Sequence, residues 1–84
     1  MAKTSTIYPT IKEKDSGEIV VQLQLFLSRC GSNVKVDGQF NVGTRNAVRA
    51  FQKKQGLEVT GVVDSKTWLK LLEKAGNINW VIDE

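Results

Sequence analysis

The sequence predicts an all-α fold: a compact three-helix bundle with an internal helix-turn duplication and extended N- and C-terminal arms. Two observations predict it. Apolar residues recur at helical spacing in three stretches, and one glycine-turn pattern follows each of the first two stretches. Such self-similarity indicates a repeating structural unit. We place the boundaries at 1–14 for the N-terminal arm, 15–76 for the three-helix domain and 77–84 for the C-terminal tail.

The two glycine turns have the same order of residues. Each has a glycine, an apolar anchor two residues later, a helix-capping residue directly after the anchor and a threonine three residues after the cap. The two sets are Gly38, Phe40, Asn41 and Thr44, and Gly61, Val63, Asp64 and Thr67. Glycine adopts backbone conformations that a tight bend requires, and a capping side-chain oxygen accepts a hydrogen bond from a free N–H at a helix start. Each turn therefore predicts a bend that leads directly into a helix.

The helices are predicted over residues 19–30, 45–55 and about 65–75. Asp15 and Glu18 have the spacing of a capping box ahead of the first helix, and Gly31 and Gly56 are typical residues for ending a helix. Helical spacing predicts the residues that face the core. They are Val20, Leu23, Leu27, Cys30, Ala47, Val48, Phe51, Trp68, Leu71, Leu72 and Ala75.

Two glutamines and two arms complete the structural prediction. Gln24 and Gln52 occupy equivalent places beside core residues, and a buried amide needs hydrogen-bond partners, so we expect each to bind the backbone of a glycine-rich loop. Pro9 forbids a helix interior near the N-terminus. We expect an extended arm whose Ile7, Tyr8 and Ile11 pack on the body, and an extended tail over residues 78–82.

Composition limits the chemistry of the chain. It has no histidine and one cysteine, Cys30, which we expect to act as a small buried hydrophobe. Serine–histidine, cysteine–histidine and histidine–metal sites are therefore excluded. A carboxylate pair would remain for glycoside hydrolysis, but its candidates Asp37 and Asp64 already have turn or capping roles. The sequence predicts no catalytic residue, no metal ligand and no cofactor.

The charge is unevenly distributed. The net charge is +3, and between positions 29 and 54 six basic residues face only Asp37. The six are Arg29, Lys35, Arg45, Arg49, Lys53 and Lys54. Such a region suits an anionic partner, either nucleic acid, a carboxylate-bearing glycan or peptide, or a phosphate-bearing wall polymer, although it is equally typical of a solvated helix face. No apolar run approaches the length of a membrane span or a signal peptide, so we expect no membrane partner.

The motifs in their order resemble the peptidoglycan-binding type 1 domain. The resemblance covers residues 17–72. It rests on Gly17, Val20, Leu23, Gln24, Leu27, Asp37, Gly38, Phe40, Thr44, Ala47, Val48, Phe51, Gln52, Gly56, Leu57, Thr60, Gly61, Val62, Val63, Asp64, Thr67, Trp68 and Leu71. The chain departs from the family's pattern at Asn41 and Asp64, where the family usually or often has glycine. Both residues cap helices well, so the fold is unaffected while the loop chemistry changes.

The resemblance implies a noncatalytic module that binds bacterial cell-wall peptidoglycan, through its glycan strand, its stem peptide or both. It implies a monomer that targets a linked cell-wall hydrolase, or a phage lytic or tail assembly, and that acts at the wall in an extracellular or periplasmic setting. Two alternatives remain: a small basic helical protein that binds nucleic acid, and a structural phage component without wall affinity. By position we nominate six ligand-binding residues: Asp37, Gln39, Phe40, Asn41, Arg45 and Arg49.

Overall fold

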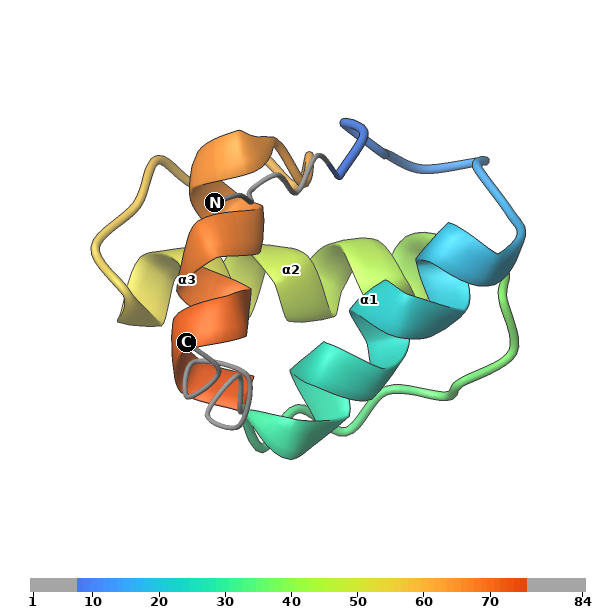
Figure 1. The fold of residues 1–84 in the computed structure, drawn as a ribbon, viewed down its shortest axis with the longest axis horizontal. Helices are drawn as coiled ribbons and strands as arrows, with labels where there is room; N and C mark the ends of the chain where they lie inside the picture. Colours follow the sequence, from blue (N-terminus) through green and yellow to red (C-terminus); the bar gives the residue numbers. More distant parts are fainter. Residues whose placement is uncertain (1–7, 76–84) are drawn as a thin grey trace, which may run out of the picture.

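The computed structural model describes residues 8–75, which form three helices and no strand. The helices are α1 (Glu18–Arg29), α2 (Val42–Lys54) and α3 (Ser65–Ala75). Figure 1 shows α1 and α3 running across α2, and α1 contacts both other helices. This arrangement confirms the predicted all-α, three-helix fold. None of the three helices is long and apolar enough to cross a membrane.

The start of α1 differs from the prediction. Its N-cap is Gly17, with φ 118°, and no side chain caps the helix. The Asp15 carboxylate instead accepts a hydrogen bond of 2.8 Å from the N–H of Lys12. It thereby closes a turn in the arm, where Lys14 adopts the left-handed region with φ 88°. The predicted capping box is therefore wrong, because Asp15 is used by the turn that precedes the helix.

The C-terminal ends of α1 and α2 follow the prediction. Gly31 and Gly56 have φ of 96° and 75°, and the N–H two residues after each C-cap donates to a carbonyl in the last turn. This is the Schellman arrangement, in which glycine removes the strain of a left-handed residue. The Asn41 side chain accepts from the N–H of Thr44 and caps α2. Because this cap is formed, α2 begins three residues earlier than the predicted range 45–55.

The core lies between the three helices and takes one anchor from each turn. Its buried apolar residues are Ile11, Val20, Leu23, Leu27, Phe40, Val48, Phe51, Val63, Trp68, Leu71 and Ala75. Of the predicted core residues, only Cys30, Ala47 and Leu72 are half-buried. Trp68 is 1% exposed, and its indole N–H donates to the carbonyl of Pro9 at 2.9 Å. The predicted role of Trp68 as a core residue is confirmed.

The N-terminal arm connects the two glycine turns. The backbones of Ile11 and Val63 exchange hydrogen bonds of 3.1 and 2.9 Å, and the N–H of Lys14 donates to the carbonyl of Phe40 at 2.8 Å. In Figure 1 the arm runs from the first turn of α3 to the start of α1. The expected packing of Tyr8 and Ile11 on the body is confirmed. Ile7 and the tail 78–82 lie outside the described residues.

Candidate functional site

The first turn is organised around the buried amide of Gln24. Its Oε1 accepts hydrogen bonds from the backbone N–H groups of Asp37 and Gly38, at 3.0 and 2.8 Å. Its Nε2 donates to the carbonyl of Gln39 and to the Thr44 hydroxyl, each at 3.0 Å. Every hydrogen-bonding position of the amide is therefore used by the turn and by the first turn of α2. The predicted backbone contact of Gln24 is confirmed.

The second turn repeats this network around Gln52. Its Oε1 accepts from the N–H groups of Thr60 and Gly61 at 2.9 and 3.0 Å, and its Nε2 donates to the carbonyl of Val62 at 3.0 Å and to the Thr67 hydroxyl at 3.1 Å. The separation between glutamine and glycine is 14 residues in the first unit and 9 in the second. The duplication predicted from the sequence therefore corresponds to the same hydrogen-bond network formed twice in the structure.

The four nominated residues of the first turn have mainly structural contacts. The Asp37 carboxylate accepts from the N–H of Gln39 at 3.0 Å and from Gln24 at 3.2 Å. The Gln39 N–H bond is the main cause that lowers the pKa of Asp37 below its ordinary value. Phe40 is 2% exposed and anchors the turn in the core. Asp37, Gln39 and Asn41 are exposed, and the oxygen of Asn41 caps α2.

Arg45 and Arg49 lie over the second turn rather than the first. A Cβ atom on Gly61 would come within 2.9 Å of the Arg45 Cγ and 3.4 Å of the Arg49 Cγ. Glycine at this position, with φ 80°, lets both aliphatic stems pack on the turn. The structure therefore divides the six nominated residues into two groups, each beside a different glycine. Sequence spacing did not indicate this division, because Gly61 and Arg45 are distant in sequence and come into contact only in the folded chain.

We call Arg45, Arg49, Gly61 and Glu13 the arginine face. The Arg45 guanidinium contacts the Glu13 carboxylate at 3.4 Å, and the two side chains are 40% and 36% exposed. The Arg45 Nε is buried and has no hydrogen-bond partner among the described residues. Arg49, one helical turn later, is exposed and takes part in no ion pair of residues 8–75. The arginine face thus presents two guanidinium groups to solvent, of which only that of Arg45 forms an ion pair within residues 8–75.

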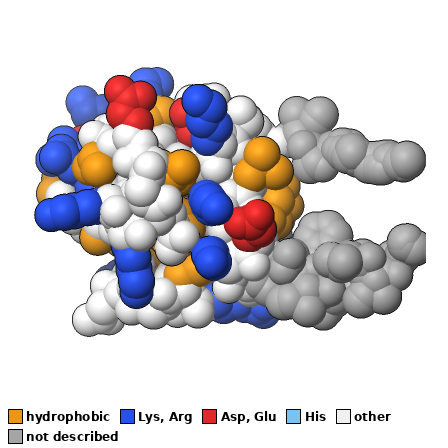
Figure 2. Space-filling view, turned by 90° about the vertical axis from the view of Figure 1, so that its left-hand side faces the viewer, with side chains coloured by type: hydrophobic (Ala, Val, Ile, Leu, Met, Phe, Trp, Pro, Cys, Tyr) orange, Lys and Arg blue, Asp and Glu red, His pale blue; other side chains and the backbone are white. Residues whose placement is uncertain are grey.

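A polar pocket of about 220 Å³ lies beside the second turn. We call it the second-turn pocket, and its lining residues are Gly56, Leu57, Glu58, Thr60, Asp64, Lys66 and Thr67. Asp64 caps α3 by accepting from the Thr67 N–H at 3.0 Å, and this bond is the main cause that lowers the pKa of Asp64. Figure 2 looks onto the side of the molecule that includes the loop into α3, where basic side chains are prominent with acidic ones between them.

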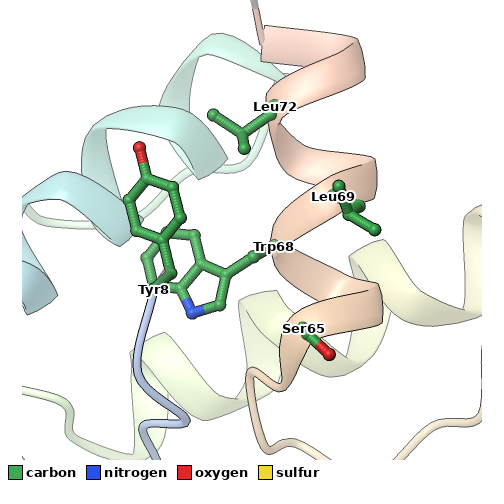
Figure 3. A pocket seen from close by; sticks show the side chains of 5 residues that line it. All are labelled: Tyr8, Ser65, Trp68, Leu69 and Leu72. Carbon is green, nitrogen blue, oxygen red and sulfur yellow. The ribbon is translucent and has the colours of Figure 1, made fainter. Parts of the chain in front are cut away.

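An apolar pocket of about 220 Å³ lies along α3. In Figure 3 the Tyr8 ring lies over the Trp68 indole, and the ring centroids are 4.5 Å apart. Leu69 and Leu72 of α3 flank this stack, and Leu69 is 64% exposed. The indole itself is buried, so the accessible surface of this pocket is mainly aliphatic and tyrosyl. The stack on Trp68 confirms the expected packing of Tyr8 on the body.

Two further observations concern catalysis and metals. In residues 8–75 no three histidine, cysteine, aspartate or glutamate side chains gather closely enough to hold a metal ion. The half-buried Cys30 packs against the core, and burial raises the pKa of its thiol, which disfavours the nucleophilic thiolate. Asp37 and Asp64 belong to separate turns, where each carboxylate accepts a backbone hydrogen bond. Both aspartates therefore have a turn or capping role, as expected.

The chain matches one protein family and is similar to several named proteins. The family model described as "Putative peptidoglycan binding domain" matches residues 16–71. A zinc D-Ala-D-Ala carboxypeptidase of Streptomyces albus G is 36% identical over 67 residues, and a spore cortex-lytic enzyme of Bacillus cereus is 47% identical over 58 residues. The matches cover 76% and 68% of this chain but only 26% and 22% of those proteins.

The chain also resembles solved structures in its fold. The crystal structure of the SleB N-terminal domain has a TM-score of 0.79 and 38% identity, covering 86% of this chain and 100% of that one. The crystal structure of a Burkholderia AP3 phage endolysin has a TM-score of 0.74 and 36% identity, covering 75% of this chain and 24% of the endolysin. The same three-helix fold is thus found both as an N-terminal domain and within a longer lytic protein.

Proposed function

Because the chain belongs to the family of peptidoglycan-binding domains, we propose that it attaches to the bacterial cell wall without catalysis, through the arginine face. The observation that carries the proposal is the seating of two arginine stems on Gly61. The two arginines lie one helical turn apart on α2, and within residues 8–75 the only ion pair that either forms is the 3.4 Å contact of Arg45 with Glu13. A pair of this kind is suited to a carboxylate, which arginine binds through two parallel hydrogen bonds.

The stem peptides of peptidoglycan supply such carboxylates, whereas the hydroxyl and acetamido groups of the glycan are neutral. We therefore place the stem peptide, rather than the glycan strand, on the arginine face. The exposed Gln39 and Asn41 side chains add amide groups near the start of the same helix. Asp37 and Phe40 support these residues by fixing the first turn, and in this proposal they do not contact the ligand.

We further propose that the chain acts as a monomeric part of a larger wall-directed protein. The named relatives are a carboxypeptidase, a spore cortex-lytic enzyme and a phage endolysin, and the chain spans about a quarter of each. Catalysis would then be carried out by another region or by an associated protein. The module would raise the local concentration of that activity at the wall, which is how linkage increases effective affinity.

The test is cosedimentation of the 84-residue chain with washed bacterial sacculi, with chitin and DNA as controls. Arg45→Ala together with Arg49→Ala should weaken retention on sacculi by about tenfold or more, because each lost charge-assisted hydrogen bond contributes roughly 1.5 to 3 kcal/mol. Lys53→Ala together with Lys54→Ala is the matched control. It also removes two exposed positive charges from α2 and should leave retention close to that of the unmodified chain.

Three results would contradict the proposal. Retention of the arginine variant at the unmodified level would remove Arg45 and Arg49 from the contact. An equal loss in both double variants would show that net charge alone holds the protein on the wall. Retention on DNA with a steep salt dependence, and none on sacculi, would favour the nucleic-acid alternative.

A further inference from the structure

The second-turn pocket contains charged residues of both signs that form no ion pair with each other. Glu58, Asp64 and Lys66 line it, and all three side chains are exposed. The two ion pairs of residues 8–75 are Arg45 with Glu13 and Lys70 with Glu73, so none of the three pocket charges is paired within 4.0 Å. Two carboxylates and one ammonium group are therefore available to a ligand in one pocket of about 220 Å³.

The walls of the pocket are held in place by buried hydrogen bonds. Gln52 binds the N–H groups of Thr60 and Gly61 through one end of its amide and the Thr67 hydroxyl through the other. Thr67 is 2% exposed and fixes the first turn of α3 to this loop. The charged groups on the loop and on α3 are thus carried by two segments that the same amide connects. Such preorganisation lowers the entropy cost of binding.

The first unit lacks this set of charges. Counting from the cap of each helix, Asn41 stands where the second unit has Asp64, and Gly43 stands where it has Lys66. The two units share their hydrogen-bonded framework. The replacement of charged residues by uncharged ones in the first unit therefore changes which ligand the surface could bind and leaves the fold the same. The combination of Glu58, Asp64 and Lys66 around one pocket therefore belongs to the second unit.

The ligand that fits is an amino-acid end, with an ammonium and a carboxylate on one carbon, carried on a short aliphatic chain. The carboxylates of Asp64 and Glu58 would accept from the ammonium, and Lys66 would donate to the carboxylate. Leu57 adds an apolar wall for methylene groups. We propose that the second-turn pocket binds the free ammonium-and-carboxylate end of diaminopimelic acid in the stem peptide, and so distinguishes it from lysine, whose side chain ends in an ammonium alone. This proposal rests on the wall binding proposed above.

The test is an amide chemical-shift titration of the 84-residue chain with two synthetic tripeptides, L-Ala-γ-D-Glu-meso-diaminopimelate and L-Ala-γ-D-Glu-L-Lys. The diaminopimelate peptide should bind about tenfold more tightly, because one charge-assisted hydrogen bond to its extra carboxylate is absent with lysine. Its shifts should be largest over residues 56–67. Lys66→Ala should abolish the preference by weakening only the diaminopimelate peptide.

Asp64→Asn should weaken both peptides, because both carry the ammonium, while an asparagine at this position still caps α3. Lys70→Ala, one turn further along α3, is the control and should change neither affinity. Equal affinity for the two peptides, or diaminopimelate shifts centred outside residues 56–67, would overturn the proposal. In either case, continued retention on sacculi would leave the wall-binding proposal standing, whereas loss of retention by the unmodified chain would refute that proposal separately.

Discussion

The two helix-turn units share a framework and differ in what they present outward. In both, a buried glutamine binds the glycine turn and the threonine of the next helix. Gly38 is approached by Val21 and by the carbonyl of Gly17, whereas Gly61 is approached by Arg45 and Arg49. The comparison teaches that the polar network inside a repeat can stay constant while the residues seated on its glycine change from apolar to cationic.

The largest expected effect comes from removing the shared network. Gln24→Ala and Gln52→Ala should each lower the free energy of unfolding by about 3 kcal/mol, because each change leaves several buried backbone and hydroxyl groups without partners. Urea denaturation would measure the loss. Hydrogen exchange would show whether the units are independent: Gln24→Ala should expose the amides of Asp37 and Gly38, and Gln52→Ala those of Thr60 and Gly61. Exposure of both turns by either change would show that they act as one unit.

The glycine pair separates stability from binding. Gly38→Ala and Gly61→Ala should each lower the free energy of unfolding by about 1 to 2 kcal/mol, because both positions have φ close to 80°. Only Gly61→Ala should also weaken retention on sacculi, since its new Cβ displaces the Arg45 stem. Thermal unfolding and cosedimentation of the two variants provide the comparison. Equal loss of wall retention in both would place the contact elsewhere.

The capping residues offer a smaller effect. Asn41→Ala and Asp64→Ala each remove a side-chain oxygen that accepts from the N–H of a threonine three residues on. Each change should lower the free energy of unfolding by about 1 kcal/mol. Urea denaturation at neutral pH would measure it. A loss confined to one of the two variants would show that the units are capped unequally despite their matching geometry.

The smallest effect concerns acid pH. The pKa of Asp64 is lowered from its ordinary 3.8, so its contribution to stability is fully present above that value and is lost as the pH falls through the folded-state pKa. Asp64→Asn keeps the cap but removes the titration, so the unmodified chain should lose more stability than the variant below pH 3.8. Solvent screening should keep the difference below about 1 kcal/mol. Parallel pH profiles for the two proteins would contradict this.

The framework was predictable because its signals are local and occur twice. Gln24 and Gln52 could be assigned to the turns from equal places in two similar stretches, and Asn41 and Asp64 could be assigned as caps. The role of Asp15 was predicted wrongly, because its carboxylate serves a turn with Lys12 that has no counterpart in the second unit. Because this turn occurs once, the repeat could not show that Asp15 has a role other than capping.

The candidate site was predicted only in part, because it depends on contacts between distant segments. Arg45 and Arg49 were nominated together with the first turn, yet their stems pack on Gly61 of the second turn. The pairing of Ile11 with Val63, which connects the arm to that turn, joins residues far apart in sequence. The second-turn pocket combines Glu58 of the loop with Asp64 and Lys66 at the start of α3. No periodicity in the sequence indicates that these three charged residues line one pocket.

Amide chemical-shift mapping with soluble muropeptides prepared from digested sacculi is the most direct test of the claim that the second unit makes the wall contact. The account predicts that the largest shifts fall on Arg45, Arg49, Gly61 and the loop that follows α2, and that Val21, on the far side of Gly38, stays unchanged. Shifts centred on Val21 and Gly38, with the second turn unaffected, would contradict it.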